Sequence, residues 1–150
     1  MKKSQRLNVI VELNAKNEQD SLKALGQIQR QRQEAEKQLE NLNVYRQDYV
    51  IKYRSISEAG THIKQLLEFR AFMNKLDKAI IEQQQVVSGA EKQVVSARTQ
   101  WEQQHQKTKS IQKVCDVAVA DELKAENKRE QSEQDERATR GGRNSGIRNA

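Results

Sequence analysis

The sequence contains no proline, a single cysteine and few aromatic residues, and each shortage excludes a class of structure. Without proline nothing interrupts a long helix, since an interior proline costs a helix about 3 kcal/mol. One cysteine cannot form an internal disulfide, which fits a reducing compartment. With 4% aromatic and 32% charged residues, the 150-residue chain has too little apolar material for a compact globular core. These shortages favour long helices that bury one narrow strip.

The sequence also lacks long hydrophobic runs. No stretch approaches the ~20 consecutive apolar residues that span a bilayer. The start is basic at Lys2 and Lys3, but the following Val9–Val11 run is too short for the core of a signal peptide. We therefore expect a soluble cytoplasmic protein with no transmembrane segment.

A heptad pattern is the dominant positive feature. Steps of three and four residues connect sixteen positions between Leu66 and Ala118, and thirteen of them are apolar. Such a pattern is typical of a helix that buries one seam against a partner helix. The sixteen positions are Leu66, Phe69, Met73, Leu76, Ile80, Gln83, Val87, Ala90, Val94, Ala97, Trp101, Gln104, Thr108, Ile111, Cys115 and Ala118.

A second heptad pattern runs from Leu25 to Ile56, and its register is less clear around Asn14 and Asn17. We expect a weaker or locally rewound seam there. Gly60 can close the first helix and Thr61 can cap the second. The fold class predicted is all-α: a long antiparallel two-helix coiled-coil hairpin with unequal arms. The hairpin covers residues 1–138 (helices at about 4–56 and 62–138, turn at 57–61), followed by a disordered Gly/Arg tail at 139–150.

Enzyme chemistry has little support in this sequence. His62 and His105 are far apart on one helix, and Cys115 falls on the seam as a small buried thiol. No phosphate-binding glycine loop, metal-ligand spacing or nucleophile motif is present in the sequence. We expect no catalytic, cofactor-binding or metal-binding residues, no cofactor and no enzymatic activity.

Apolar residues beside the seam are more informative than the missing motifs. An antiparallel turn at Gly60 places residues 38–49 opposite residues 70–83, so that four side chains could form one aromatic patch: Tyr45, Tyr49, Phe72 and Leu76. The patch either broadens the seam or docks a partner. A second group lies where the first helix ends, and an unpaired helix with such residues needs another surface to cover it: Val114, Val117, Val119 and Leu123.

Charge is distributed unevenly along the chain, whose net charge is +6. Residues 1–115 carry 20 basic and 13 acidic side chains, and residues 116–136 carry 3 basic and 8 acidic ones. The basic excess is compatible with a nucleic-acid-binding helical arm, but the basic residues are mixed with acidic ones and form no stripe. A scaffold coiled coil of another secretion machine is a further alternative.

In these features the chain resembles the flagellar FliJ family, over roughly residues 4–137. The matching positions are Gln33–Leu39 with Leu42, Tyr45 and Tyr49, then Phe72, Leu76, Lys78–Ile80, Gln83, Trp101 and Ala125–Asn127. The resemblance implies a non-enzymatic, stalk-like component of the flagellar type III export apparatus. Such proteins bind the hexameric export ATPase, promote its assembly and activity, and couple it to the membrane export gate and to export chaperones.

The resemblance also implies two docking sites and a location. The export-gate site maps onto Gln38, Leu42, Tyr45, Tyr49, Phe72, Leu76, Ala79 and Gln83. The ATPase contact would lie at the end where the termini meet, at Leu7, Val11, Val117, Val119 and Leu123. No nucleic acid is expected as a partner, and the protein would be cytoplasmic and peripherally associated with the inner-membrane export apparatus. The family pattern does not include the Gly/Arg tail, so no function is transferred to it.

Overall fold

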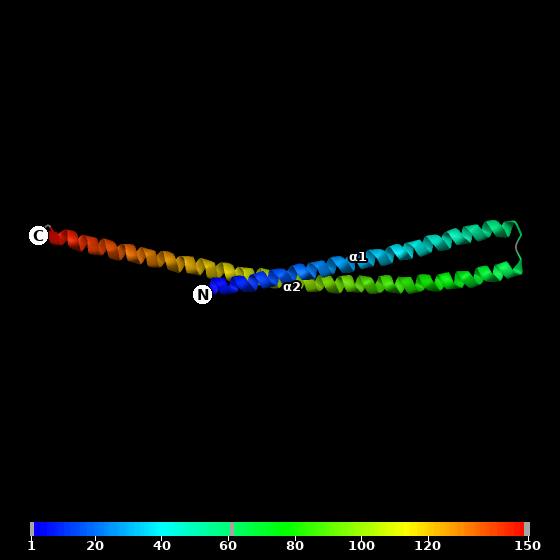
Figure 1. Ribbon diagram of the computed structural model, residues 1–150, viewed down its shortest axis with the longest axis horizontal. Helices are drawn as coiled ribbons and strands as arrows, with labels where there is room; N and C mark the ends of the chain where they lie inside the picture. Colours follow the sequence, from blue (N-terminus) through cyan, green and yellow to red (C-terminus); the bar gives the residue numbers. More distant parts are fainter. Residues whose placement is uncertain (1, 61, 149–150) are drawn as a thin grey trace. The chain divides into compact units, whose positions relative to one another are not determined.

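The computed structural model describes residues 2–60 and 62–148, with side chains as far as residue 143. It consists of two helices, α1 (Lys3–Glu58) and α2 (Ile63–Arg148), and the described residues include no strand. Figure 1 shows the helices running in opposite directions from a short connection around Gly60. The predicted all-α hairpin with unequal arms is confirmed.

The connection forms where the sequence places it. The Ala59 amide donates to the Ile56 carbonyl oxygen at 3.1 Å, and the Gly60 amide donates to that of Ser57 at 3.1 Å. Gly60 has φ 100°, a left-handed conformation that favours glycine because it has no Cβ. Both helices begin or end within two residues of the predicted bounds at this turn. The predicted cap, Thr61, lies outside the described residues.

The chain divides into two compact units, each with its own seam. The turn unit, Gln19–Gln103, holds two apolar clusters. One contains Leu25, Val94 and Ala97, and the other contains Met73, Leu76 and Ile80 with partly buried neighbours from both helices. The end unit, Met1–Glu18 with Gln104–Ala150, buries Val11, Asn14, Cys115 and Ala118.

The α2 seam follows the predicted register closely. Of the sixteen predicted positions, fifteen are buried or half-buried, and Leu66, next to the turn, is the exception at 39% exposed. On α1 the register Leu25 to Tyr53 is likewise buried or half-buried. The same heptad continues towards the N-terminus through Ser21, Glu18, Asn14, Val11, Leu7 and Ser4.

The local rewinding expected around Asn14 and Asn17 is therefore wrong, whereas the weaker seam that was the other expectation for this place stays a prediction. Asn14 is 5% exposed and occupies a seam position in unbroken register, while Asn17 is exposed. The seam is polar at this point because polar side chains of α2 lie opposite Asn14 and form hydrogen bonds with it. Apolar periodicity cannot detect a seam position that a hydrogen-bonded asparagine fills.

At its far end α2 continues to Arg148, past the predicted end at residue 138, so the predicted tail is helical up to that residue. Glycine weakens a helix but keeps its N–H, unlike proline, so Gly141 and Gly142 do not end it. The preceding turn is supported by Arg140, whose Nη2 lies 2.9 Å from Glu136 Oε1. Residues 149–150 lie outside the described residues.

Candidate functional site

The first candidate surface lies in the turn unit and is called the aromatic surface here. It comprises the eight residues predicted for export-gate docking. Each helix contributes two seam residues, seven positions apart. Each also contributes two residues, again seven apart, from the heptad position directly beside the seam. The seam residues are Leu42, Tyr49, Leu76 and Gln83, and the flanking residues are Gln38, Tyr45, Phe72 and Ala79. In an antiparallel pair these two flanks adjoin, so α1 and α2 contribute equally.

Ring contacts hold the centre of this surface together. The rings of Tyr49 and Phe72 lie 4.4 Å apart between centroids, and Tyr45 meets Phe72 edge to face at 6.1 Å. Tyr45 also lies 6.4 Å from Tyr49. Such contacts add about 0.5–1.5 kcal/mol per pair beyond area burial. The predicted gathering of the rings is therefore present in the structure.

Exposure decides which of these rings could meet a partner. Tyr45 is 52% exposed, whereas Leu76 is 6% exposed and belongs to a buried cluster with Met73 and Ile80. Tyr49 and Phe72 are half-buried and pack against the same cluster. The surface therefore broadens the seam, as one interpretation of the sequence expected, and docking of a partner through the exposed Tyr45 ring stays a prediction.

Two side-chain amides, those of Gln38 and Gln83, lie at the end of the aromatic surface that is farther from the turn. Gln83 Nε2 donates to the backbone carbonyl oxygen of Ala35 at 3.0 Å and lies 3.4 Å from Gln38 Oε1. The Ala35 contact holds the Gln83 amide across the seam, and Gln38 remains exposed. The exposed Gln38 side chain, seven residues before Tyr45, therefore keeps its amide N–H groups for hydrogen bonds with a partner.

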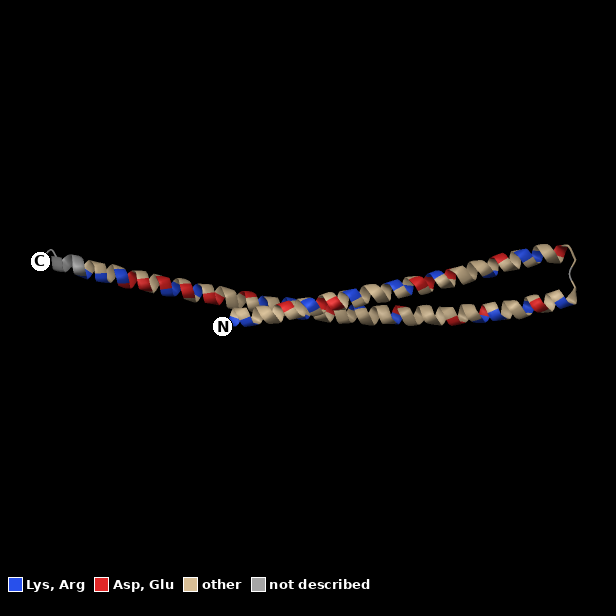
Figure 2. Cartoon of the chain, viewed as in Figure 1, with Lys and Arg blue, Asp and Glu red and all other residues tan. Residues whose placement is uncertain are grey.

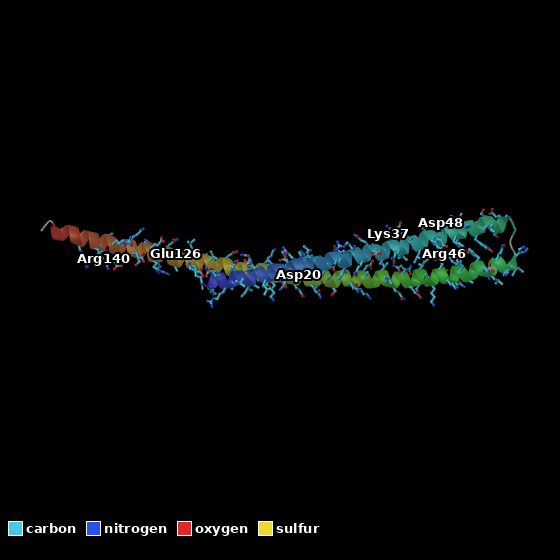
Figure 3. The ribbon with its side chains drawn as sticks, viewed as in Figure 1. Asp20, Lys37, Arg46, Asp48, Glu126 and Arg140 are labelled. Atoms are coloured by element: carbon cyan, nitrogen blue, oxygen red, sulfur yellow. The ribbon has the colours of Figure 1, made fainter. Side chains whose placement is uncertain are left out.

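Sequence reasoning missed two neighbours of this surface. Tyr53 stacks on Phe69 with centroids 3.7 Å apart, which extends the run of rings towards the turn. Arg46, labelled in Figure 3, has its Nε 2.6 Å from Asp77 Oδ1, and this ion pair joins the two helices. Each pair joins one residue of α1 to one residue of α2 at the same height along the hairpin. Aligning the two heptad patterns in antiparallel order around Gly60 could therefore have predicted both pairs.

The second candidate surface lies in the end unit, where the five residues predicted for ATPase contact do not form one surface. Leu7 is half-buried and Val11 is 9% exposed, because both are seam residues. Val117 is 61% exposed, Val119 50% and Leu123 57%. Val119 and Leu123 are one turn apart on one side of α2, and Val117 lies on the other side of the seam.

Exposed apolar residues of α1 lie in the end unit in addition to the group on α2 that the sequence indicated, of which Val114 is a member. Val9, Ile10 and Leu13 of α1 are 58%, 44% and 57% exposed, and Val114 of α2 is 52% exposed. Val114 and Val117 line a shallow depression together with Lys3, Lys113, Ala118 and Asp121. Ile10 and Val114 each directly precede a seam residue, Val11 and Cys115. This shared position beside the seam could have indicated that the two side chains belong to one exposed group.

The part of α2 that follows Glu122 extends past the N-terminal end of α1. It is a charged helix that no other described residues cover. From Leu123 to Arg143 every side chain is exposed. Figure 2 shows acidic residues concentrated along this part of α2, with basic residues between them. Glu126 and Arg140 mark it in Figure 3. This segment can form ion pairs with a partner but can bury little apolar area.

Glu122 of α2 accepts two hydrogen bonds from Ser4 in the first turn of α1. The Ser4 hydroxyl donates to Glu122 Oε2 at 2.6 Å, and the Ser4 amide donates to Oε1 at 3.0 Å. The hydrogen bond from the Ser4 hydroxyl and then that from the Ser4 amide hold the pKa of Glu122 below its ordinary value of 4.5. Desolvation opposes them, and the charge of Lys2 adds the least to the lowering. The carboxylate also satisfies a free N–H at the helix start.

This contact predicts a pH-dependent closure of the α1 start. A lowered pKa stabilises the folded state above the ordinary value of 4.5, and that contribution disappears as pH falls through the folded-state pKa. Cys115 reports on this place, because its Sγ lies 3.8 Å from the Ser4 carbonyl oxygen. At pH 7 we expect Glu122→Gln to speed the reaction of Cys115 with dithiodipyridine several-fold, and the difference from wild type to disappear as pH falls through the lowered pKa of Glu122.

The matched control is Glu126→Gln, which removes a carboxylate one turn away. Glu126 lines a second shallow depression of the end unit together with Glu122 and Lys2. The control variant should react at the wild-type rate throughout. Equal rates for Glu122→Gln and wild type at pH 7 would contradict the role of Glu122.

The side chains on these surfaces are aromatic, aliphatic, amide and charged groups. In the part of the chain that the structure describes, no group of three or more His, Cys, Asp or Glu residues could hold a metal ion. No helix within the same residues is long and apolar enough to cross a membrane. The aromatic surface and the end unit instead offer exposed apolar and charged side chains.

Comparisons with known proteins agree with the resemblance inferred from the residues. The sequence pattern of the family described as "Flagellar FliJ protein" matches residues 2–146. Two curated relatives with that same name, from Escherichia coli (strain K12) and Salmonella typhi, are each 28% identical over 134 residues, which covers 89% of this chain and 91% of each relative. No solved structure matches the chain. Because the family pattern covers nearly the whole sequence, the chain belongs to the flagellar FliJ family.

Proposed function

We propose that this chain, as a FliJ-family component of the flagellar export apparatus, is a non-enzymatic adaptor with two docking surfaces. The aromatic surface binds the membrane export gate. The end unit binds the hexameric export ATPase, promotes its assembly and stimulates its hydrolysis. Export chaperones are further partners, and the protein works in the cytoplasm at the inner-membrane export apparatus.

The observation that carries the proposal is the aromatic surface itself. The resemblance to the family maps gate contact onto these residues, and in the structure they have a half-buried base with the Tyr45 ring exposed. An aromatic ring that is held in place by packing loses little conformational entropy on binding, which is why tyrosine is frequent at interface centres.

The end unit supports the ATPase contact through Val117, Val119 and Leu123, each at least half exposed. Exposed valine and leucine on a helix without a covering partner favour docking into another protein. Leu7 and Val11 contribute only by holding α1 against α2 in this arrangement, since their side chains lie in the seam.

The test is hydrolysis of ATP by the purified export ATPase in the presence of equal concentrations of each variant. The chain alone should hydrolyse no ATP, and the wild type should stimulate its partner. Val119→Glu with Leu123→Glu should remove most of that stimulation, because two carboxylates would then enter an apolar contact.

The matched control introduces the same two charges in the turn unit, as Ile81→Glu with Val95→Glu, at positions 56% and 63% exposed. This control should stimulate like wild type. Equal stimulation by the Val119/Leu123 variant would place the ATPase contact elsewhere. No stimulation by the wild type would instead favour a scaffold coiled coil or a nucleic-acid-binding arm.

A further inference from the structure

The seams of the two units differ in chemistry. In the turn unit the buried side chains are apolar and form clusters around Leu25 and Ile80. In the end unit the described buried side chains are Val11, Cys115 and Ala118 together with Asn14, which is 5% exposed. The N-terminal segment of α1, Lys3–Glu18, therefore relies on polar contacts with α2 to a degree that the rest of α1 does not.

Three polar contacts hold this segment, and they are spaced along its length. At its start Ser4 donates twice to Glu122. In its middle, Gln104 Nε2 lies 3.1 Å from Asn14 Oδ1 and 3.3 Å from the Asn14 carbonyl oxygen. Thr108 Oγ1 also approaches that carbonyl oxygen, at 3.3 Å.

The third contact lies at the end of the segment, where His105 Nδ1 pairs with Glu18 Oε1. Its two side chains are partly exposed, at 34% and 21%. All three contacts join α1 to α2 within the end unit.

Polar and apolar contacts respond differently when two helices separate. Water can replace each of these hydrogen bonds, so their net contribution to pairing is small. It cannot replace apolar burial, which is the main force that holds a seam closed. The segment next to a polar seam is accordingly the part with the lowest local stability.

We propose that the Lys3–Glu18 segment separates from α2 as one unit while the turn unit stays paired. Opening would expose Ile111, Cys115 and Ala118 on α2, beside Val114 and Val117, which are already exposed. It would also free Leu7 and Val11 of α1. The end unit thus has an open form with an apolar face that the closed form lacks, and this holds whether or not the export ATPase is its partner.

Thiol labelling of the full-length chain tests this opening, with three probes each carried as the sole cysteine. Cys115 reports on the start of the segment, and Val11→Cys in a Cys115→Ala background reports on its middle. Ala97→Cys in the same background reports on the turn unit, where Ala97 is 6% exposed. Labelling rates in buffer without denaturant are corrected by the rate for each unfolded variant.

We expect Cys115 and Val11→Cys to be labelled at rates within threefold of each other, and both at least tenfold faster than Ala97→Cys. Fast labelling of Cys115 alone would mean that only the first turn frays, and equal rates for all three would mean that the hairpin opens only by global unfolding. Either result would overturn the proposal.

A measurement without a new cysteine guards against destabilisation by Val11→Cys. Amide hydrogen exchange of the wild-type chain should be at least tenfold faster over residues 7–18 than over residues 25–42. Similar exchange of the two stretches would contradict the inference.

A seam variant tests the cause. Asn14→Leu with Gln104→Leu replaces both partners of the central polar contact by apolar groups, so neither is left unsatisfied. Labelling of Cys115 in this variant should slow at least tenfold, while labelling at Ala97→Cys in the same variant stays as it was. Unchanged labelling of Cys115 would show that the polar seam does not govern the opening.

Discussion

Ile80→Asp should strongly destabilise the turn unit. Ile80 is 8% exposed and belongs to the cluster with Met73 and Leu76, on which rings of both helices pack. An aspartate there would lose the apolar contacts and place a carboxylate without a partner in the seam. We expect the free energy of unfolding to fall by more than about 3 kcal/mol. Urea unfolding followed by circular dichroism at 222 nm measures it.

The neighbouring residue supplies the control. Ile81 is 56% exposed, so Ile81→Asp makes the same chemical change one position away on the open side of α2. Aspartate lowers helix propensity equally at both positions, and the difference between the two variants therefore isolates the seam. Ile81→Asp should change the stability by less than about 1 kcal/mol. Similar losses for both variants would mean that the register of α2 is not the one described.

Tyr45→Ala should give the largest effect on binding. If the aromatic surface docks the export gate, loss of its most exposed ring should weaken binding at least tenfold, as for a hot-spot residue of about 2 kcal/mol or more. Stability should fall only modestly, since the Tyr45 contacts with Tyr49 and Phe72 are two ring pairs at the edge of the cluster. Isothermal titration with the purified gate protein and a thermal melt on the same sample provide both values.

Val44→Ala is the matched control, because Val44 is 50% exposed and adjacent in sequence but points away from the rings by one helical step. It should bind the gate like wild type. Phe72→Ala is less suitable as a first test, since Phe72 also packs on the buried cluster and its loss would mix folding with binding. Normal gate binding by Tyr45→Ala would leave the aromatic surface as part of the seam alone.

Sequence alone was sufficient for the hairpin and for most of its register. The positions from Phe69 to Ala118 repeat so regularly that a single face of α2 had to be buried, and apolar spacing is the physical cause of that burial. The same regularity located the aromatic surface, because Gln38, Tyr45, Phe72 and Ala79 share one heptad flank. Membership of the FliJ family, inferred from those residues, is confirmed over residues 2–146.

Polar parts of the seam could not be predicted in the same way. Asn14 looks like an interruption in the sequence, and only the position of Gln104 and Thr108 on the opposite helix shows that it continues the seam. The residues predicted for ATPase contact in the end unit mixed buried and exposed side chains for a related reason. Leu7 and Val11 are as apolar as Val119 and Leu123, and only the pairing of the helices distinguishes the buried residues from the exposed ones.

The position of the turn determines the order in which the chain can close. The Arg46–Asp77 pair spans 31 residues of chain, Gln83 and Ala35 span 48, Gln104 and Asn14 span 90, and Ser4 and Glu122 span 118. Loop closure favours the shortest span, and each pairing shortens the loop that the next one must close. We therefore expect folding to proceed as a zipper from Gly60 towards the termini. On the ribosome, the N-terminal half of α1 must then wait until α2 has been made as far as Glu122, the residue that contacts Ser4.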